Sequence, residues 1–314
     1  MNPKVKGYTL GAIAAATYGM NPLFALPLYS AGMDPLSVLF FRYLLALPIL
    51  GAMIKLRGRS FRISTADLLP LMVFGVLFAL SSITLFSSYQ HMDAGIASTM
   101  LFVYPIMVAL IMAALFHERL TWQTMLCLLM AVGGIALLYR SADGATLSLV
   151  GTLLVMGSAL AYAIYIVGIN KGRLKEMPTL KVTFYVLAFG WTIFAAHAIY
   201  TGQLHTPPAA SKHLWLNLIA LALLPTIVSL LCTTRAIQLI GSTPTAILGA
   251  LEPVTAVFFG IVVFGEQLTL RQAVGMVLIV AAVSVVVAGK QFSAYMVRLR
   301  KMFPRINRKN NANN

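Results

Sequence analysis

Two stretches of this sequence, residues 94–140 and 242–288, follow the same plan at an offset of 148 positions. Each is an apolar helix that contains a proline, then a short polar break, then a second apolar helix. Pro105 matches Pro253 without a gap, and a Glu-x-Leu-Thr motif begins at Glu118 and again at Glu266. Apolar identity repeats by chance, but a proline followed thirteen residues later by this motif is a more specific match. The pattern predicts a duplicated unit.

Both units are predicted to lie in a membrane, because the chain is too apolar for a soluble domain. Its 314 residues are 60% hydrophobic and 10% charged, with a mean hydropathy of +0.87, whereas a soluble domain carries about 25% charged residues. About 20 apolar residues cross a bilayer as a helix. We therefore expect an all-α membrane protein with ten transmembrane helices, at residues 6–26, 35–55, 67–89, 95–116, 122–139, 149–170, 180–201, 213–238, 244–264 and 270–289.

The positive charges predict the orientation of these spans. If the N-terminus is cytoplasmic, the segments on that side hold all but five of the 23 lysine and arginine residues. The exceptions are two arginines within spans and three residues in outside loops: Arg42 and Arg235, then Arg140, Lys212 and Arg271. This bias favours cytoplasmic termini at both ends. It also argues against nucleic-acid binding as the reason for the net charge of +15, because the charges lie in short loops and one tail.

The ten spans divide into two units of five, and an odd number of spans places the second unit upside down in the bilayer. This arrangement of two inverted five-helix repeats is that of many secondary transporters. We expect the first repeat at residues 1–143, the second at 144–289 and a basic tail at 290–314. Apolar residues recur at helical spacing in the tail, which predicts an amphipathic helix on an anionic inner leaflet. A solvated tail without a function is the alternative.

Glu252 is the acidic residue that falls in the middle of a predicted span, directly before Pro253. The proline cannot donate to the carbonyl of Gly249, so a freed acceptor is expected beside a carboxyl group. Tyr104 holds the matching position before Pro105. We expect Tyr104 and Glu252 to line a central cavity, where Glu252 is a candidate for binding a proton or a substrate ammonium group. The alternative is a neutral glutamate that ties two helices together.

Other polar residues within spans are further candidates for the lining of a cavity, and each has a structural alternative. Arg42 is a candidate for binding a substrate carboxylate or balancing Glu252, or it snorkels or packs. Asn21 and Gln90 either donate hydrogen bonds to a solute or cap helix ends. Aromatic side chains at helical spacing either face the cavity or pack: Tyr18, Tyr162 and Tyr165. Prolines within spans are candidate hinges: Pro22, Pro105 and Pro253.

No pattern in the sequence predicts an enzyme. There is no cluster of histidines and acids with metal-ligand spacing, no Gly-x-Ser-x-Gly motif and no phosphate-binding loop. We therefore expect no catalytic residue, no metal and no cofactor. Without a nucleotide site, transport would use gradients.

Several of these motifs together resemble those of EamA-type members of the drug/metabolite transporter superfamily. The segments 18–21, 42–46 and 162–165 are similar to motifs of the first, second and sixth spans of the family. Pro105 through Thr121, and Glu252 through Glu266, are similar to its proline-to-glutamate signatures. The resemblance covers about residues 5–290 and leaves the tail outside. His117 departs from the pattern, because a small residue often precedes the glutamate in the family.

The resemblance implies ten helices around a central cavity, alternating access and export of small metabolites such as amino acids from a bacterial cytoplasm across the inner membrane. Proton coupling and facilitated diffusion both stay open. So do other functions: a transporter of another solute class such as nucleotide sugars or drugs, and a membrane-embedded binding or scaffold protein that docks through its tail. A lipid-modifying enzyme would need a nucleophile or metal cluster, and the sequence has neither.

Overall fold

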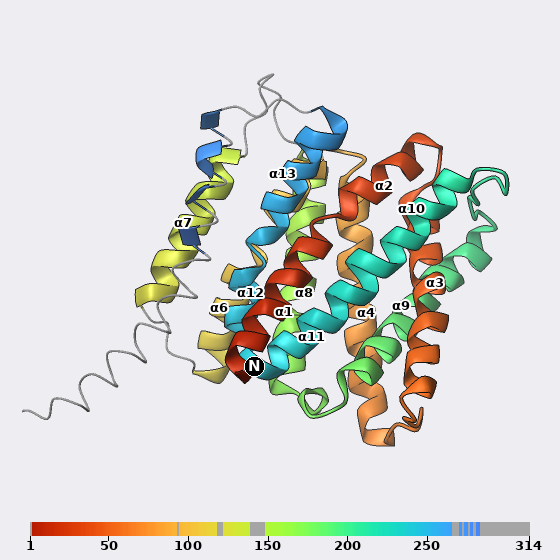
Figure 1. Cartoon of the computed structure of the whole chain (residues 1–314), viewed down its shortest axis with the longest axis horizontal. Coiled ribbons are helices and arrows are strands. Elements are labelled where there is room, and N and C mark those ends of the chain that lie inside the picture. Colours follow the sequence, from red (N-terminus) through yellow and green to blue (C-terminus); the bar gives the residue numbers. More distant parts are fainter. Residues whose placement is uncertain are drawn as a thin grey trace, which may run out of the picture.

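In this computed structural model the chain is a bundle of helices (Figure 1). The structure describes residues 2–92, 94–117, 122–138 and 148–265, with a few more between 270 and 282, and within these residues there is no β-strand. The helices are α1 (Pro3–Tyr18), α2 (Asn21–Ser30), α3 (Pro35–Leu56), α4 (Thr65–Ser88), α5 (Ala94–Leu101), α6 (Tyr104–Phe116), α7 (Trp122–Leu138), α8 (Leu149–Lys171), α9 (Thr179–Thr201), α10 (Lys212–Ala222), α11 (Ser229–Ile240), α12 (Ser242–Leu248) and α13 (Leu251–Phe264), with a 3-10 turn η1 (Arg173–Lys175) and a π-helix η2 (Leu223–Val228).

The helices follow the spans predicted from hydropathy. Among the described residues, six helical stretches are long and apolar enough to cross a membrane: Pro35–Leu56, Thr65–Ser88, Leu149–Lys171, Thr179–Thr201, Lys212–Ile240 and Ser242–Phe264. Shorter apolar helices lie at Tyr104–Phe116 and Met125–Gly134. Most of the predicted tenth span, both Glu-x-Leu-Thr motifs and the tail at 290–314 lie outside the described residues.

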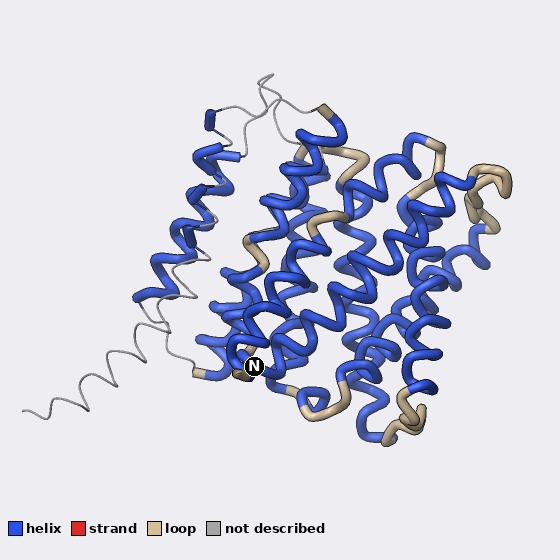
Figure 2. The backbone as a smooth tube through the Cα atoms, in the orientation of Figure 1, coloured by secondary structure: helices blue, strands red, loops and turns tan. Residues whose placement is uncertain are grey.

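Three of the predicted spans are each divided into two helices, which the uniform apolar runs did not predict. The breaks fall at residues 19–20, 102–103 and 249–250, and Figure 2 shows loop segments that interrupt helices inside the bundle. Each break lies just before one of the candidate hinge prolines, Pro22, Pro105 and Pro253. A proline fits the first turn of a helix, but within a continuous helix it leaves the carbonyl four residues earlier without a donor and its ring clashes with that carbonyl, so the helix is interrupted there. Hinge motion at these breaks stays a prediction.

The start of α3 has the local structure that its sequence predicts. Pro35 occupies its first turn, and Asp34 accepts hydrogen bonds from the backbone N–H groups of Leu36 (3.1 Å) and Ser37 (3.2 Å). The ring of His205 lies 2.9 Å from the Asp34 carboxylate. Partial burial opposes ionisation of Asp34, but the hydrogen bonds from Ser37 and His205 outweigh it and hold the pKa of this carboxyl below its usual range. Asp34 therefore joins the start of α3 to the loop after α9.

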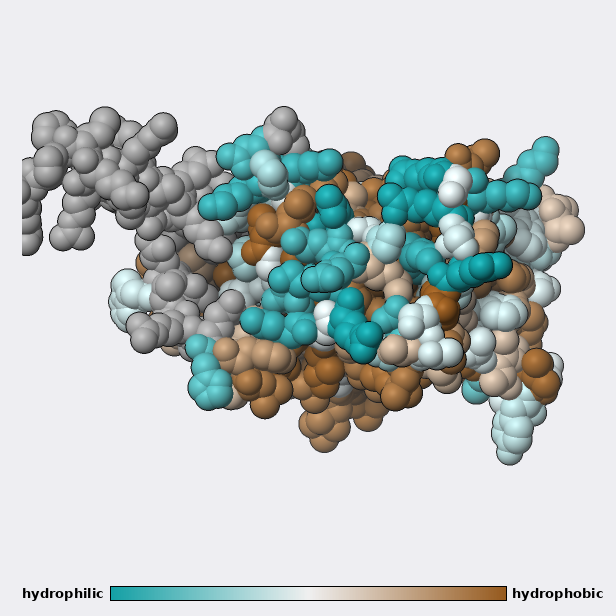
Figure 3. Space-filling model, turned by 90° about the horizontal axis from the view of Figure 1, so that it is seen from below, coloured by the Kyte–Doolittle hydropathy of each residue, from teal (hydrophilic) through white to brown (hydrophobic). Residues whose placement is uncertain are grey.

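Small residues let helices from the two halves of the chain approach closely. α4 packs against α8 and α9, while α1 packs against α11. The hydroxyls of Ser81 on α4 and Ser158 on α8 lie 3.0 Å apart, and Ser229 on α11 donates to the carbonyl of Ala14. Such contacts are typical of membrane helices, which have no hydrophobic driving force between them. Figure 3 shows hydrophilic residues gathered on the end of the molecule where α1 begins, bordered by hydrophobic residues.

The two copies of the repeated sequence form matching structures. α5 and α6 correspond to α12 and α13 at the offset of 148, and both divided helices end in a left-handed residue, His117 (φ 54°) and Gly265 (φ 68°). α5 packs against α13, and α6 packs against α12. The first half of each divided helix therefore lies beside the second half of the other, so the two run in opposite directions and cross at their breaks.

Candidate functional site

The crossing of the two divided helices joins the two residues that the repeat placed in register. Tyr104 donates a hydrogen bond to Oε1 of Glu252 over 3.2 Å. Both side chains are buried, at 2% and 4% exposure. Each stands in the first turn of its second half-helix, α6 or α13. The N-terminal end of a helix favours negative charge, so this contact places a carboxyl group where two helix N-termini meet.

Two glycines at the breaks make this contact possible. A Cβ atom on Gly249 would lie 1.6 Å from the Tyr104 hydroxyl oxygen. A Cβ atom on Gly19 would lie 2.4 Å from the backbone oxygen of Glu252. The first, fourth and ninth predicted spans therefore meet at their breaks. The sequence analysis did not select either glycine as part of the site, although each stands one to three residues before a candidate polar residue.

Tyr104 and three tyrosines stacked beside it form what we call the tyrosine cluster: Tyr18, Tyr104, Tyr162 and Tyr165. The rings of Tyr18 and Tyr162, which match at an offset of 144, stack with centroids 6.0 Å apart and planes 5° apart. Tyr104 meets Tyr162 edge to face at 4.8 Å, and Tyr165 stacks on Tyr162 at 6.0 Å. All four are buried. The structure thus brings together five of the predicted site residues.

A small void lies against Tyr104, Tyr162 and Glu252, with room of about 10 Å³ for water, which accommodates about one molecule. Residues that the sequence analysis missed also line it, from α1, α11 and α12: Gly11, Ala14, Ala15, Thr233 and Thr245. They are small or bear hydroxyls, and the sequence gives no periodic signal for them.

Arg42 lies in a second buried site at the π-helix. Its side chain has no exposed surface. Its Nε donates to the hydroxyl of Thr226 and its Nη2 donates to the carbonyl of Pro225 over 3.1 Å, and its guanidinium lies 5.2 Å from the centre of the Phe86 ring. A proline in a helix frees backbone acceptors, and π-helical turns often occur at functional sites. Nη1 has no hydrogen-bond partner among the described residues.

Arg42 and Glu252 do not form an ion pair in the described part of the chain, so they do not balance each other by direct contact. The ring of Tyr89 lies on the Arg42 side, because it packs on Phe86 with centroids 5.5 Å apart and the Arg42 guanidinium lies over that same Phe86 ring. Tyr89 was missed in favour of its neighbour Gln90, but Tyr89 is the buried residue of the two.

The remaining candidates divide between the interior and the surface. Asn21 is 1% exposed, and neither atom of its amide has a partner within the described residues. Gln90 lies exposed in the turn after α4, and Arg235 is exposed near the end of α11. The structure does not bring Gln90 into the tyrosine cluster.

Several buried polar atoms lack a hydrogen-bond partner and are therefore available to bind a solute. In the described residues these include Oε2 of Glu252, Nη1 of Arg42 and the amide of Asn21. Buried polar groups normally have partners, so these atoms are candidates to bind a solute. The set offers an acceptor for an ammonium group and donors for a carboxylate. The described residues hold no group of three side chains suited to a metal ion.

Comparison with known proteins identifies relatives of the chain. A model of the EamA-like transporter family matches residues 5–140 and again residues 149–288. An uncharacterized transporter of Archaeoglobus fulgidus is 30% identical over 258 residues, covering 81% of this chain and 87% of that protein. The uncharacterized transporter YcbK of Bacillus subtilis is 25% identical over 263 residues, covering 79% and 81%. A crystal structure with 20% identity superposes with a TM-score of 0.74 over 90% of this chain and 96% of its own, which supports the fold.

Proposed function

This chain belongs to the EamA-like transporter family, and from that premise we propose that it is a secondary transporter that exports amino acids or related small metabolites by alternating access. The observation that carries the proposal is the buried pair Tyr104–Glu252 at the crossing of two antiparallel divided helices. Half-helices that meet in the interior are the usual binding sites of secondary transporters.

Two inverted five-helix repeats are part of this proposal, with residues 1–143 in the first and 144–289 in the second. The antiparallel crossing of α5–α6 with α12–α13 supports it. So does the stacking of Tyr18 on Tyr162, because these residues match at an offset of 144 and equivalent residues of two repeats meet near the axis that relates them.

The chemistry of the unpartnered atoms supports a zwitterionic substrate. A substrate ammonium would bind Oε2 of Glu252, and a substrate carboxylate would bind Nη1 of Arg42 or the amide of Asn21. A proton on Glu252 would compete with the ammonium group, which is one route to proton coupling.

In alternating access the tyrosine cluster would open towards one side of the membrane at a time. The breaks before Pro22, Pro105 and Pro253 are the proposed hinges. We place the protein in the bacterial inner membrane with both termini in the cytoplasm, and we assign it no enzymatic reaction. A transporter of nucleotide sugars or drugs, or a binding protein, is the competing function.

The test is a panel of solutes against the purified protein in detergent. The panel contains amino acids, the matching amines without a carboxylate, the matching carboxylic acids without an amine, and nucleotide sugars. A ligand raises apparent stability by mass action, so the amino acids should raise the melting temperature while single-charge analogues should not. Radiolabelled flux of the hits into proteoliposomes then separates transport from binding. Stabilisation by nucleotide sugars alone would refute the proposed substrate class.

A further inference from the structure

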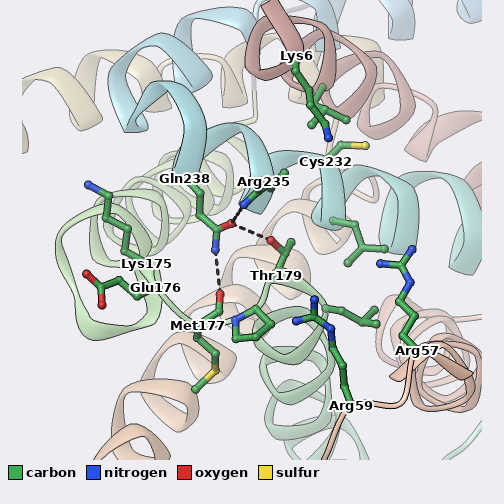
Figure 4. A pocket seen from close by; sticks show the side chains of 14 residues that line it. Lys6, Arg57, Arg59, Lys175, Glu176, Met177, Thr179, Cys232, Arg235 and Gln238 are labelled. Carbon is green, nitrogen blue, oxygen red and sulfur yellow. Dashed lines mark hydrogen bonds between the residues drawn. The ribbon is translucent and has the colours of Figure 1, made fainter. Parts of the chain in front are cut away.

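A separate pocket opens on the end of the molecule where α1 begins, and we call it the basic pocket (Figure 4). Its volume is about 840 Å³, within the range of about 300–1,000 Å³ that small-molecule sites occupy. Five cationic side chains and one acidic side chain, Glu176, line it; the cations are Lys6, Arg57, Arg59, Lys175 and Arg235.

The cations converge from segments that are far apart in the sequence. Lys6 lies on α1, Arg57 and Arg59 follow α3, Lys175 ends η1 and Arg235 lies on α11. Among the described residues the ion pairs are Asp67–Arg173 and Asp34–His205, so no carboxylate there forms an ion pair with any of the five, and Glu176 offsets one of five positive charges. Like charges that repel one another in the empty pocket would be stabilised by a bound anion.

One wall of the pocket is fixed in advance by hydrogen bonds. Arg235 donates from Nη1 to Oε1 of Gln238 over 3.0 Å. The same oxygen accepts from the hydroxyl of Thr179 over 2.9 Å, and Nε2 of Gln238 donates to the carbonyl of Met177 over 3.0 Å. These bonds tie α11 to the start of α9 and hold the guanidinium in place. A pre-positioned guanidinium loses less entropy when it binds an anion.

The surroundings of the cations indicate the chemistry of the ligand. Leucines contribute an apolar wall: Leu10, Leu180 and Leu231. Guanidinium groups match the oxygens of phosphate in pairs. We propose that the basic pocket binds a phosphate-bearing anion, either a soluble phosphate compound or the headgroup of an anionic phospholipid. Basic pockets between membrane helices at the cytoplasmic side suit such headgroups.

The basic pocket does not rest on the proposed transport function, because it lies outside the tyrosine cluster. The two sites nevertheless share α11: Thr233 lines the central void, while Cys232 and Arg235 line the basic pocket. A bound phosphate would draw together the ends of α1, α3, α9 and α11.

The experiment compares two double variants that remove the same charge. Arg57→Gln/Arg59→Gln removes cations from the pocket, whereas Lys55→Gln/Arg62→Gln removes two nearby cations that do not line it. Inorganic pyrophosphate is titrated against each protein in neutral detergent at fixed ionic strength. In a second arm, the melting temperature is measured in nanodiscs of phosphatidylglycerol and of phosphatidylcholine.

If the ligand is a soluble phosphate compound, pyrophosphate should bind the wild type. The pocket variant should bind pyrophosphate about tenfold or more weakly, because charge-assisted hydrogen bonds are lost. If the ligand is a phospholipid headgroup, phosphatidylglycerol should raise the melting temperature of the wild type and of the control variant, relative to phosphatidylcholine, but not that of the pocket variant. Equal responses of both variants in both arms, or no response of the wild type to either phosphate, would overturn the proposal. Lys175→Gln/Arg235→Gln carries the same expectation should the first pocket variant fail to fold.

Discussion

Gly249→Ala is the sharpest test of the crossing between the two repeats. The added Cβ would lie 1.6 Å from the Tyr104 hydroxyl oxygen, 2.7 Å from the ring carbon that bears it and 2.8 Å from the carbonyl oxygen of Ala246. Tyr104 must therefore move, and its hydrogen bond to Glu252 is lost. The two effects are distinct: one is overpacking and the other is an unsatisfied buried group.

The magnitude follows from these two costs. Overpacking a filled interior costs about 1–3 kcal/mol. A buried donor or acceptor left without a partner costs about 1–3 kcal/mol. Gly249→Ala should therefore destabilise the protein by roughly 2–6 kcal/mol.

Gly157→Ala on α8 is the matched control, because a Cβ there meets no atom within 4 Å. This substitution should raise stability by up to about 1 kcal/mol through helix propensity. Apparent melting temperatures in detergent compare the two variants with the wild type. The double variant Tyr104→Phe/Gly249→Ala removes the nearest clashing oxygen, so it should lose less than the sum of its single changes. If Gly249→Ala has as high a melting temperature as Gly157→Ala, the close contact described at the crossing of the two divided helices is wrong.

Three further perturbations test other parts of the structure. His117→Gly should stabilise the protein by about 1 kcal/mol in thermal unfolding, because His117 has a φ of 54° and a non-glycine residue in this left-handed region is strained. An unchanged stability would contradict that backbone conformation. Because the pKa of Asp34 is lowered by folding, its contribution should be complete above its unfolded value of about 4 and should fade as pH drops through its folded pKa. The melting-temperature difference between wild type and Asp34→Asn should thus shrink below about pH 4, and a constant difference down to lower pH would contradict it. Arg42→Met should destabilise the protein by about 1–3 kcal/mol, because the buried carbonyl of Pro225 loses its donor, and it should abolish carboxylate-dependent stabilisation. Intact carboxylate-dependent stabilisation in this variant would make Arg42 structural.

The sequence predicted the helices well because membrane spans are set by local composition. The predicted spans at 35–55, 149–170 and 180–201 differ from α3, α8 and α9 by one residue or less at each end. The repeat also predicted that Tyr104 and Glu252 would share a site, since a gapless offset fixes which residues correspond. The family resemblance is confirmed by the match to residues 5–140 and 149–288.

The contacts around Arg42 were beyond sequence analysis, because they depend on packing between distant spans. Its partners Pro225 and Thr226 lie in a π-helix more than 180 positions away. The stacking of the rings in the tyrosine cluster was also not predicted, since hydropathy does not show which aromatic rings of different spans pack on one another. Gln90 illustrates the same limit, because a polar residue at a span end can face either way.

Flux through Glu252→Gln tests the central claim most directly. The variant keeps the shape of the side chain but removes the charge that would hold an ammonium group. Asp67→Asn is the control, because the Asp67 carboxylate forms a surface ion pair with Arg173, whose side chain is 70% exposed. In proteoliposomes loaded with an amino acid that stabilises the wild type, Glu252→Gln should lower radiolabelled flux by about tenfold or more, given the strength of charge-assisted hydrogen bonds, while Asp67→Asn should transport like the wild type. Equal flux through Glu252→Gln and wild type would contradict a substrate site at the crossing of the two divided helices.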